Sequence, residues 1–439
     1  MSEAESASVP PPASQPAPAE PAARLWLSFG DQGTAAGAVG RSTHAAQDLS
    51  ALALFGDTLW TAGDERASIE RFVSQGNRDG GGFGEHRSYA LGELLDLPAG
   101  PEGEVDIEGV DVDGGCLWVA GSHSLRRLKP DPEREAEPGA LVERLARLDR
   151  QDNRYTLARL PLAPDERGRP APVARTDARP TRKAAHLPFK GSGNRLTKLL
   201  RHDPHLAPFM TVPAKENGFD IEGLAVRGQR VFLGLRGPVL RGYAVILELR
   251  VEQKGRKLKL EPLGGGGGDK DGGERYRKHF LDLRGLGVRD LAFDGDDLLI
   301  LAGPTLAHDG RHAVFRWEGA LRTDAPVLLR DPEPRHLFDL RLVPDRDRAE
   351  GIALREEPGG RRGLIVVYDS PAAGRLDPGG GRVALDLFPL PDHRLVGPGG
   401  AIAAAASAGA SVGSAVRAAV TDARPAGARR RAPPKPAGS

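Results

Sequence analysis

Glutamates stand at a recurring place in the sequence, immediately before a glycine that opens a short apolar segment. Glu108, Glu222 and Glu350 all occupy this place. Carboxylates that converge on one site can bind a hard cation such as Ca²⁺, or act as acids and bases beside a polar substrate. The pair also has a structural interpretation, because a glutamate before a glycine can accept backbone N–H bonds and fix the start of a strand.

Further polar residues precede or follow apolar segments in the same way. This set comprises Asp64, Glu65, Asp106, Ser122, Lys215, Asn217, Asp220, Arg236, Arg241, Arg289, Asp290 and Asp369. Carboxylates that meet in one place are costly unless cations neutralise them. A divalent cation such as Ca²⁺ is one solution, and its ligands would be Asp106, Glu108, Glu222 and Glu350. Pairing with arginines is the other, and the forked guanidinium would also suit an anionic ligand.

His123 follows Ser122 at the end of an apolar segment. An imidazole beside an acid can act as a general base, and the acid here would be Asp106, Glu108 or Glu65. A hydrogen-bonded structural histidine is the commoner situation for an isolated His. The candidate catalytic residues are therefore His123, Glu108 and Glu222, and whether the protein is an enzyme stays open.

The familiar motifs of hydrolases and nucleotide-binding enzymes do not support a specific reaction. The Gly-x-Ser-x-Gly match at residues 409–413 falls in an Ala/Gly/Ser-rich tail and lacks the strand–turn–helix context of a nucleophile elbow. The sequence contains no P-loop, no His-Glu-x-x-His and no Cys/His cluster. The single cysteine, Cys116, excludes an internal disulfide and fits a reducing compartment. With no signal-peptide pattern at the N-terminus, we expect a cytoplasmic protein.

The candidate residues belong to a module that repeats about every 60 residues. Each copy has an apolar segment, a tight turn and a second apolar segment, as in a β-hairpin. Copies begin at Ser50, Glu108, Glu222, Arg289 and Glu350, so the spacings are 58, 114, 67 and 61 residues. Because 114 is twice 57, a degenerate unit is expected within the long interval. Further strands follow in most copies, and four strands per 60 residues are typical of a propeller blade.

We therefore predict an all-β fold, a β-propeller with six blades, or with five as the alternative. A two-sheet sandwich is less consistent with so regular a spacing. The predicted domain spans residues 24–396, with a partly helical insertion at about 163–210 and disordered tails at 1–23 and 397–439. The strand near residues 25–29 is expected to pair with the last sheet and close the ring.

Propeller geometry predicts where the polar residues meet. The first strand of each blade starts at one rim of the central channel and the second returns to it, so residues before the first and after the second lie on one face. The overall charge argues against nucleic-acid binding. The chain has 61 Lys plus Arg and 60 Asp plus Glu, a net charge of +1, whereas a nucleic-acid-binding protein normally has an excess of basic residues. The apolar stretch at 401–416 is too weakly apolar to span a membrane.

Five segments also resemble a known family. They are residues 104–109, 117–124, 215–224, 234–242 and 368–371. They look like the bacterial family catalogued as domain of unknown function 3616, over residues 50–391. The resemblance implies a shared fold and brings no activity with it. More distantly, the repeated Glu-Gly starts are similar to esterase-like phytase propellers, in which acidic residues on the channel face bind calcium and phosphate esters.

Three functions follow as hypotheses. The leading one is a cytoplasmic propeller that binds a small polar or anionic ligand, or a protein partner, through Glu, Arg and His on the channel face. The second is a metal-assisted phosphoesterase or esterase, in which His123 is the acid or base. The third is an interaction scaffold whose charged face is only solvated. No nucleic acid or membrane partner is expected.

Overall fold

The computed structural model describes residues 18–30, 46–63, 67–76, 81–135, 137–263, 274–330, 333–357, 359–377 and 381–391. All of them belong to one compact unit, Met1–Asp392. Most of both predicted tails, the glycine run at 264–268, Asp64 and Glu65 lie outside the described residues.

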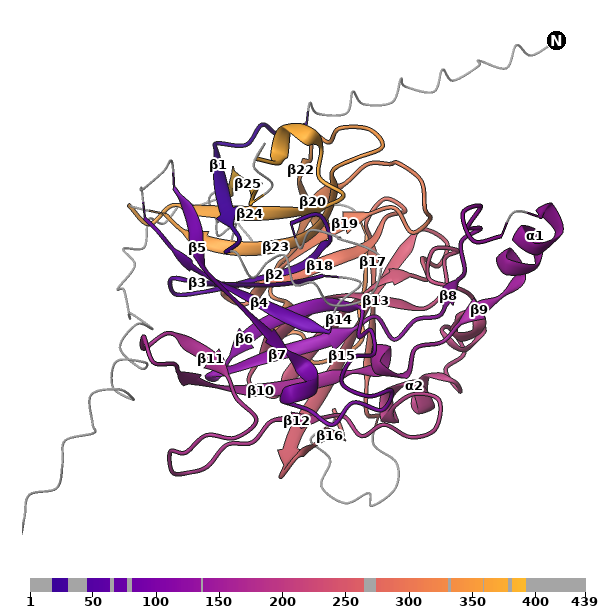
Figure 1. Cartoon of the computed structure of the whole chain (residues 1–439), viewed down its shortest axis with the longest axis horizontal. Coiled ribbons are helices and arrows are strands. Elements are labelled where there is room, and N and C mark those ends of the chain that lie inside the picture. The colour runs from indigo at the N-terminus through magenta and orange to yellow at the C-terminus, as the bar shows by residue number, and fades with distance from the viewer. Residues whose placement is uncertain are drawn as a thin grey trace, which may run out of the picture. The chain divides into compact units, whose positions relative to one another are not determined.

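Most strands of this unit form five groups of four, each paired antiparallel and called a sheet below. Figure 1 labels these strands. The first contains β2 (Leu49–Phe55), β3 (Thr58–Gly63), β4 (Ser68–Ser74) and β5 (Gly82–Ala90). The second contains β6 (Ile107–Asp113), β7 (Cys116–Gly121), β10 (Leu157–Pro164) and β12 (Ala185–His186). The third contains β13 (Asp220–Arg227), β14 (Arg230–Gly237), β15 (Tyr243–Lys254) and β17 (Arg277–Asp282).

The fourth sheet contains β18 (Gly287–Asp294), β19 (Asp297–Gly303), β20 (Ala313–Trp317) and β22 (Arg335–Asp339). The fifth contains β23 (Arg348–Glu356), β24 (Arg362–Asp369), β25 (Arg382–Pro389) and β1 (Ala23–Ser28). The shorter strands β11 (Pro170–Pro172), β16 (Lys257–Glu261) and β21 (Leu328–Leu329) extend them. Parallel pairs, β1 with β5 and β12 with β16, join some of these groups into larger sheets. β8 (Arg126–Arg127) and β9 (Leu148–Asp149) pair with each other in a separate two-stranded sheet.

The five sheets form a closed ring and are the blades of a β-propeller. The first strands contact one another in a cycle, β2 with β6, β6 with β13, β13 with β18, β18 with β23 and β23 with β2. β1 pairs antiparallel with β25 from Ala23 to Ser28, so the N-terminal strand completes the last blade, as predicted. It also pairs parallel with β5 of the first blade at two positions, which leaves no free edge where the ring closes.

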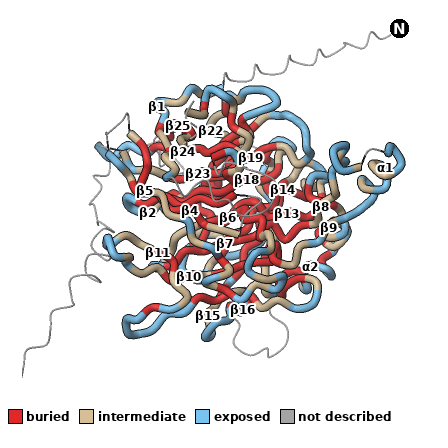
Figure 2. Tube along the Cα trace, in the orientation of Figure 1, coloured by how far each residue is buried: buried red, intermediate tan, exposed pale blue. Residues whose placement is uncertain are grey.

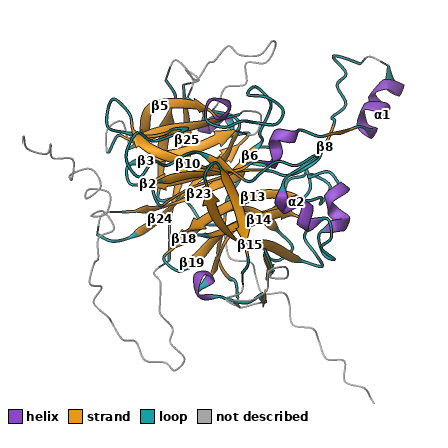
Figure 3. Ribbon diagram, turned by 90° about the horizontal axis from the view of Figure 1, so that it is seen from below, coloured by secondary structure: helices purple, strands orange, loops and turns teal. Residues whose placement is uncertain are grey.

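The described residues form five blades, the lower of the two predicted numbers. Among the described residues, the long interval between the second and third modules holds no further four-stranded blade, only a two-stranded sheet of β8 and β9. Much of its length is an excursion between β7 and β10, which carries β8, the helix α1 (Pro138–Ala146) and β9. Figure 3 shows α1 away from the strands of the blades. The interval near twice the module length therefore comes from this excursion together with the long segment between β10 and β13.

The predicted insertion contains one short helix, α2 (Arg195–Leu200). Asn194 precedes it and accepts a hydrogen bond from the backbone N–H of Thr197, as an N-cap does. Leu196 and Leu200 are fully buried in the core between the second and third blades. The helix fills only a small part of the predicted insertion, because the chain turns at residues 201–206 and continues in a 3-10 turn, Ala207–Thr211.

Apolar side chains of neighbouring blades pack against each other around the ring, and Figure 2 shows the strands as the buried part of the unit. One cluster, for example, joins Trp60 of the first blade to Leu117 and Leu160 of the second. Burial between blades fixes the rotation of each sheet, and hence the place of the residues at its rim. In the part of the chain that the structure describes, no helix is long and apolar enough to cross a membrane.

Candidate functional site

The recurring glutamates mark one structural feature, a β-bulge near the start of the first strand of each blade. The pairing register shifts at this place in β2, β6, β13, β18 and β23. The extra residues are Ser50, Glu108, Glu222, Arg289 and Glu350. A bulge redirects a side chain away from the regular alternation of a strand. The repeat thus places one residue per blade, mostly charged, at equivalent positions around the ring.

The glycine after each glutamate is required by the packing of neighbouring first strands. A Cβ atom on Gly109 would lie 2.5 Å from the Cβ of Leu224 in the next blade. One on Gly351 would lie 2.9 Å from the backbone carbonyl carbon of Ala51. Both separations are below normal van der Waals contact. The Glu-Gly pair therefore combines a structural glycine with an acidic side chain that the bulge redirects.

Arginines neutralise two of these glutamates. Arg289 Nη1 lies 3.0 Å from Glu222 Oε2, and its Nη2 forms an ion pair with Glu350. Arg236 Nη1, at the end of β14, lies 2.9 Å from Glu222 Oε1. All four residues are buried. We call them the Arg289 cluster. The sequence left two ways to neutralise the converging carboxylates, a divalent cation or arginines. The structure shows arginines.

Burial controls the protonation of the acids in this region. It raises the pKa of Glu350 to about 7, although Arg289 and Arg236 act in the opposite direction. Burial also raises the pKa of Asp220 well above its ordinary value, and the neighbouring Glu222 adds to the effect. Asp220 Oδ2 is 3.9 Å from Arg236 Nη1, too far for a strong ion pair. A carboxyl with a pKa near 7 can change its charge under physiological conditions.

A cavity of about 320 Å³ opens beside the Arg289 cluster. Its charged and imidazole-bearing lining residues are Lys215, Arg236, Arg289, His308, Asp309, His312, Arg346, Asp347, Arg348 and Glu350. Five cations thus face three carboxylates. Within the described residues, neither Lys215 nor Arg346 has an ion-pair partner.

The cavity carboxylates have other partners. Asp347 accepts hydrogen bonds from Arg375 Nε and from the backbone N–H of Ala372, each at 2.9 Å or less. Asp309 accepts one from the backbone N–H of Asp345. Glu350 pairs with Arg289, as described. The remaining positive charge makes the cavity electropositive, and an electropositive cavity attracts anions.

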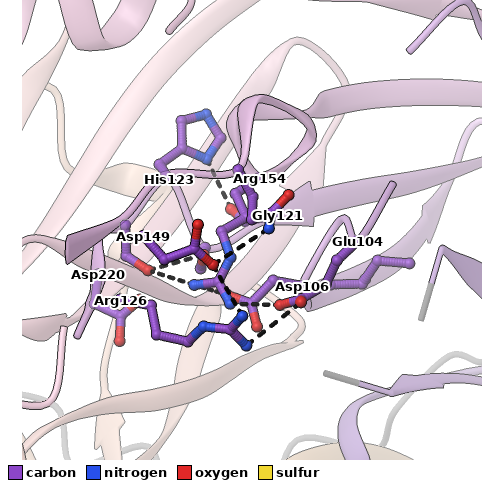
Figure 4. Close-up of polar contacts among 12 residues, drawn as sticks. Glu104, Asp106, Gly121, His123, Arg126, Asp149, Arg154 and Asp220 are labelled. Carbon is purple, nitrogen blue, oxygen red and sulfur yellow. Dashed lines mark hydrogen bonds and ion pairs between the residues drawn. The ribbon is translucent and has the colours of Figure 1, made fainter. Parts of the chain in front are cut away.

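A second ion-pair network, the Arg154 cluster, lies at the rim of the second blade (Figure 4). Arg154 Nη2 is 2.5 Å from Glu104 Oε1, and its Nη1 is 2.9 Å from Asp106 Oδ2. Arg126 pairs with Asp149 at 2.9 Å and with Glu104 at 3.4 Å. The cluster comprises these five residues. Its two arginines are both paired with carboxylates, so it has no cation to spare.

His123 does not contact the carboxylates expected as its partners. Its Nδ1 donates to the carbonyl of Gly121 at 2.7 Å, and its Nε2 accepts from Asn194 Nδ2 at 2.7 Å. Figure 4 shows the ring turned away from Glu104 and Asp106. Burial lowers the pKa of His123 to about 4, so it stays neutral at physiological pH. With both nitrogens engaged, it has the geometry of a structural histidine; the prediction of an acid partner was wrong.

Several other predicted site residues hold the backbone instead of facing the cavity. Asp290 is fully buried and accepts N–H bonds from Ile352 at 2.7 Å and Leu291 at 2.8 Å. Asn217 accepts one from Val239 at 2.9 Å. Burial correspondingly raises the pKa of Asp290 well above its ordinary value.

The remaining predicted residues lie at varied places. Ser122 is buried and accepts a hydrogen bond from Ser124 at 3.0 Å. Asp369 is 3.8 Å from Arg348 at the edge of the cavity. Arg241 is exposed in the turn before β15 and is not part of the cavity lining. Glu108 is buried at its bulge. The structure thus gathers Lys215, Arg236, Arg289 and Glu350 around one cavity.

The residues proposed as metal ligands do not form a metal site. In the described part of the chain, no group of three or more His, Cys, Asp or Glu is placed to hold a metal ion. Glu222 and Glu350 are paired with Arg289, and Asp106 with Arg154. Guanidinium groups therefore occupy the positions beside these carboxylates that a cation would need.

Sequence reasoning missed Arg154, His312, Arg346 and Arg348. Arg346 precedes β23, and Arg348 is the first residue of that strand, two positions before Glu350. His312 precedes β20, the third strand of its blade, and Arg154 lies in a 3-10 turn, Asp152–Tyr155, at the end of the excursion between β7 and β10. Burial lowers the pKa of His312 to about 3, and the nearby Arg289 acts in the same direction.

Residues 48–386 match the model of one protein family, described as "Protein of unknown function (DUF3616)". No curated protein matches the chain. Among solved structures, a glutaminyl cyclase from Myxococcus xanthus is 10% identical with a TM-score of 0.33, over 85% of this chain and 100% of that chain. An endo-arabinase from Bacteroides thetaiotaomicron is 10% identical with a TM-score of 0.36, over 80% and 95%. A xylan beta-1,4-xylosidase from Bacillus halodurans is 10% identical with a TM-score of 0.35, over 79% and 54%.

Proposed function

We propose, for a chain that belongs to the family of proteins of unknown function DUF3616, that the cavity beside Arg289 binds a small anionic ligand. The observation that carries the proposal is the excess of cations around this cavity. Arg236 and Arg289 lie at its buried side, and Lys215 and Arg346 add charge without an ion-pair partner among the described residues. Guanidinium groups bind carboxylate and phosphate oxygens through paired N–H bonds.

The size of the cavity supports a small molecule more than a protein partner. Its volume of about 320 Å³ is at the lower end of the range of about 300–1,000 Å³ for small-molecule sites. The metal-assisted hydrolase stays a prediction, which the guanidinium groups beside its carboxylates do not favour. A cytoplasmic location also stays a proposal, supported by the buried free thiol of Cys116.

Calorimetric titration of the full chain with phosphate, acetate and citrate tests the proposal. In the double variant Lys215→Ala/Arg346→Ala, we expect binding of the tightest of these anions to weaken by roughly three- to tenfold, because exposed charge interactions contribute about 0.2–1 kcal/mol each. Both side chains are exposed, so the fold should tolerate the change.

The matched control is Lys198→Ala/Arg361→Ala, which removes two exposed cations that do not line the cavity. It should bind the anion as the wild type does. If all three anions fail to bind the wild type, or if both double variants lose affinity equally, the cavity is not the anion site.

A further inference from the structure

One wall of the cavity is apolar and part of it is open to solvent. Its apolar residues are Pro304, Leu306, Ala307, Leu342, Val343 and Pro344. Leu306 is 43% exposed and Val343 is 48% exposed, among the few large apolar side chains that the described surface shows. Single exposed apolar residues are ordinary, but two at the mouth of one cavity form a local apolar surface.

The two loops that carry this wall are held in place by the fold. Leu306 belongs to the loop between β19 and β20, and its backbone forms a β-bridge with Glu216. Val343 belongs to the loop between β22 and β23, and its N–H donates to Asp347 Oδ2 at 3.3 Å. Asp347 is in turn fixed by Arg375. A wall held in this way can bind a ligand without first becoming ordered.

The charged part of the cavity lining already holds a carboxylate. Glu350 forms an ion pair with Nη2 of Arg289, and both residues line the cavity. Arg236, the second guanidinium of the Arg289 cluster, pairs with Glu222, which is not part of the lining. The group that Arg289 binds within the cavity is therefore a carboxylate of the chain itself, which a carboxylate of a ligand can replace.

We propose that the ligand is an organic carboxylate with an apolar body. Its carboxylate takes the place of the Glu350 side chain on Arg289, and its body lies against Leu306 and Val343. This inference rests on the proposed anion site and adds the class of ligand. An inorganic anion or acetate would contact only the charged residues of the cavity. A neutral molecule of the same shape would contact only its apolar residues.

Three probes separate these contributions in calorimetric titrations at pH 6: 3-phenylpropionate, its neutral amide and acetate. We expect 3-phenylpropionate to bind at least tenfold more tightly than either of the others. The variant Leu306→Ser/Val343→Ser should lose about tenfold in affinity for 3-phenylpropionate and keep the wild-type affinity for acetate. Leu328→Ser, in β21, is the control, because Leu328 is 54% exposed and does not line the cavity. Thermal unfolding of each variant checks its fold.

The outcomes distinguish this inference from the proposed function. If acetate binds as tightly as 3-phenylpropionate, the anion site stands and the apolar ligand class is wrong. If the amide binds as tightly as the acid, carboxylate recognition is wrong. If phosphate, citrate and both acids all fail to bind, the anion site and the inference fail together.

Discussion

The Arg289 cluster and the Arg154 cluster use the same side-chain types and differ in their charge balance. In the Arg154 cluster, two arginines face Glu104, Asp106 and Asp149, so each cation has a carboxylate partner. The Arg289 cluster borders a cavity in which Lys215 and Arg346 add positive charge. The comparison teaches that converging charges can be fully paired with one another. We propose that an unbalanced charge beside a cavity is what marks a ligand site.

The largest effects are expected from removing the central arginine of each cluster. Arg289→Met and Arg154→Met should each lower the free energy of unfolding by about 3–5 kcal/mol, because each leaves buried carboxylates without a partner. Only Arg289→Met should abolish binding of anions. Chemical denaturation gives the first quantity and calorimetry the second. Equal loss of binding in both variants would remove the distinction between the clusters.

A smaller effect is expected at the hydrogen bonds of His123. Asn194→Ala removes the donor to His123 Nε2 and to the carbonyl of Tyr155, and the N-cap of α2. We expect a loss of about 1–3 kcal/mol in the free energy of unfolding, because buried acceptors are left unsatisfied. Anion binding should not change. A large loss of binding with an intact fold would show that His123 belongs to the site.

The smallest predicted effect is a pH dependence of anion binding through Glu350. Its surroundings are Arg289 and Arg236, which favour its charged form, and Glu222 and Asp369, which oppose it. With a pKa of about 7, the carboxyl is mostly neutral at pH 6 and mostly charged at pH 8. The charged form competes with the ligand for Arg289, so affinity should fall by about tenfold between these values.

The matched variant for this prediction is Glu350→Gln, in which the side chain at position 350 is uncharged at both pH 6 and pH 8. Its affinity should be nearly constant from pH 6 to pH 8 for an anion whose own charge does not change, such as acetate. A wild-type affinity that stays constant over this range would mean that Glu350 does not compete for Arg289.

Much of the fold could be predicted, because the repeat carries it. Each of the five predicted modules begins in the first strand of a blade, and the strand near residue 25 closes the ring. The blade number could not be read from spacing, because the excursion after β7 and the long segment between β10 and β13 together lengthen the interval between the second and third modules by about a module. Neither the sequence of α1 nor that of its flanking strands distinguishes an excursion from a degenerate blade.

The candidate site was predicted less well, for a physical reason. The position of a residue in the repeat predicts whether it lies at the rim of the central channel. On this basis Lys215, Arg236, Arg289 and Glu350 were predicted to lie close together, and all four line the cavity. The position cannot show which of them are already paired. His123 was misjudged because its partner Asn194 comes from an insertion 71 residues away. Arg154 and His312 were missed because they lie outside the two repeat positions that we considered.

The most direct test compares two variants that remove charge in balanced sets. Arg289→Met/Glu350→Gln keeps the pair of Glu222 and Arg236, and Arg154→Met/Asp106→Asn keeps the pairs that Arg126 forms with Glu104 and Asp149. Each is titrated with 3-phenylpropionate at pH 6 in a calorimeter. We expect the first variant to lose binding by at least a hundredfold and the second to bind as the wild type does. Wild-type binding by the first variant would contradict the assignment of the cavity as the ligand site.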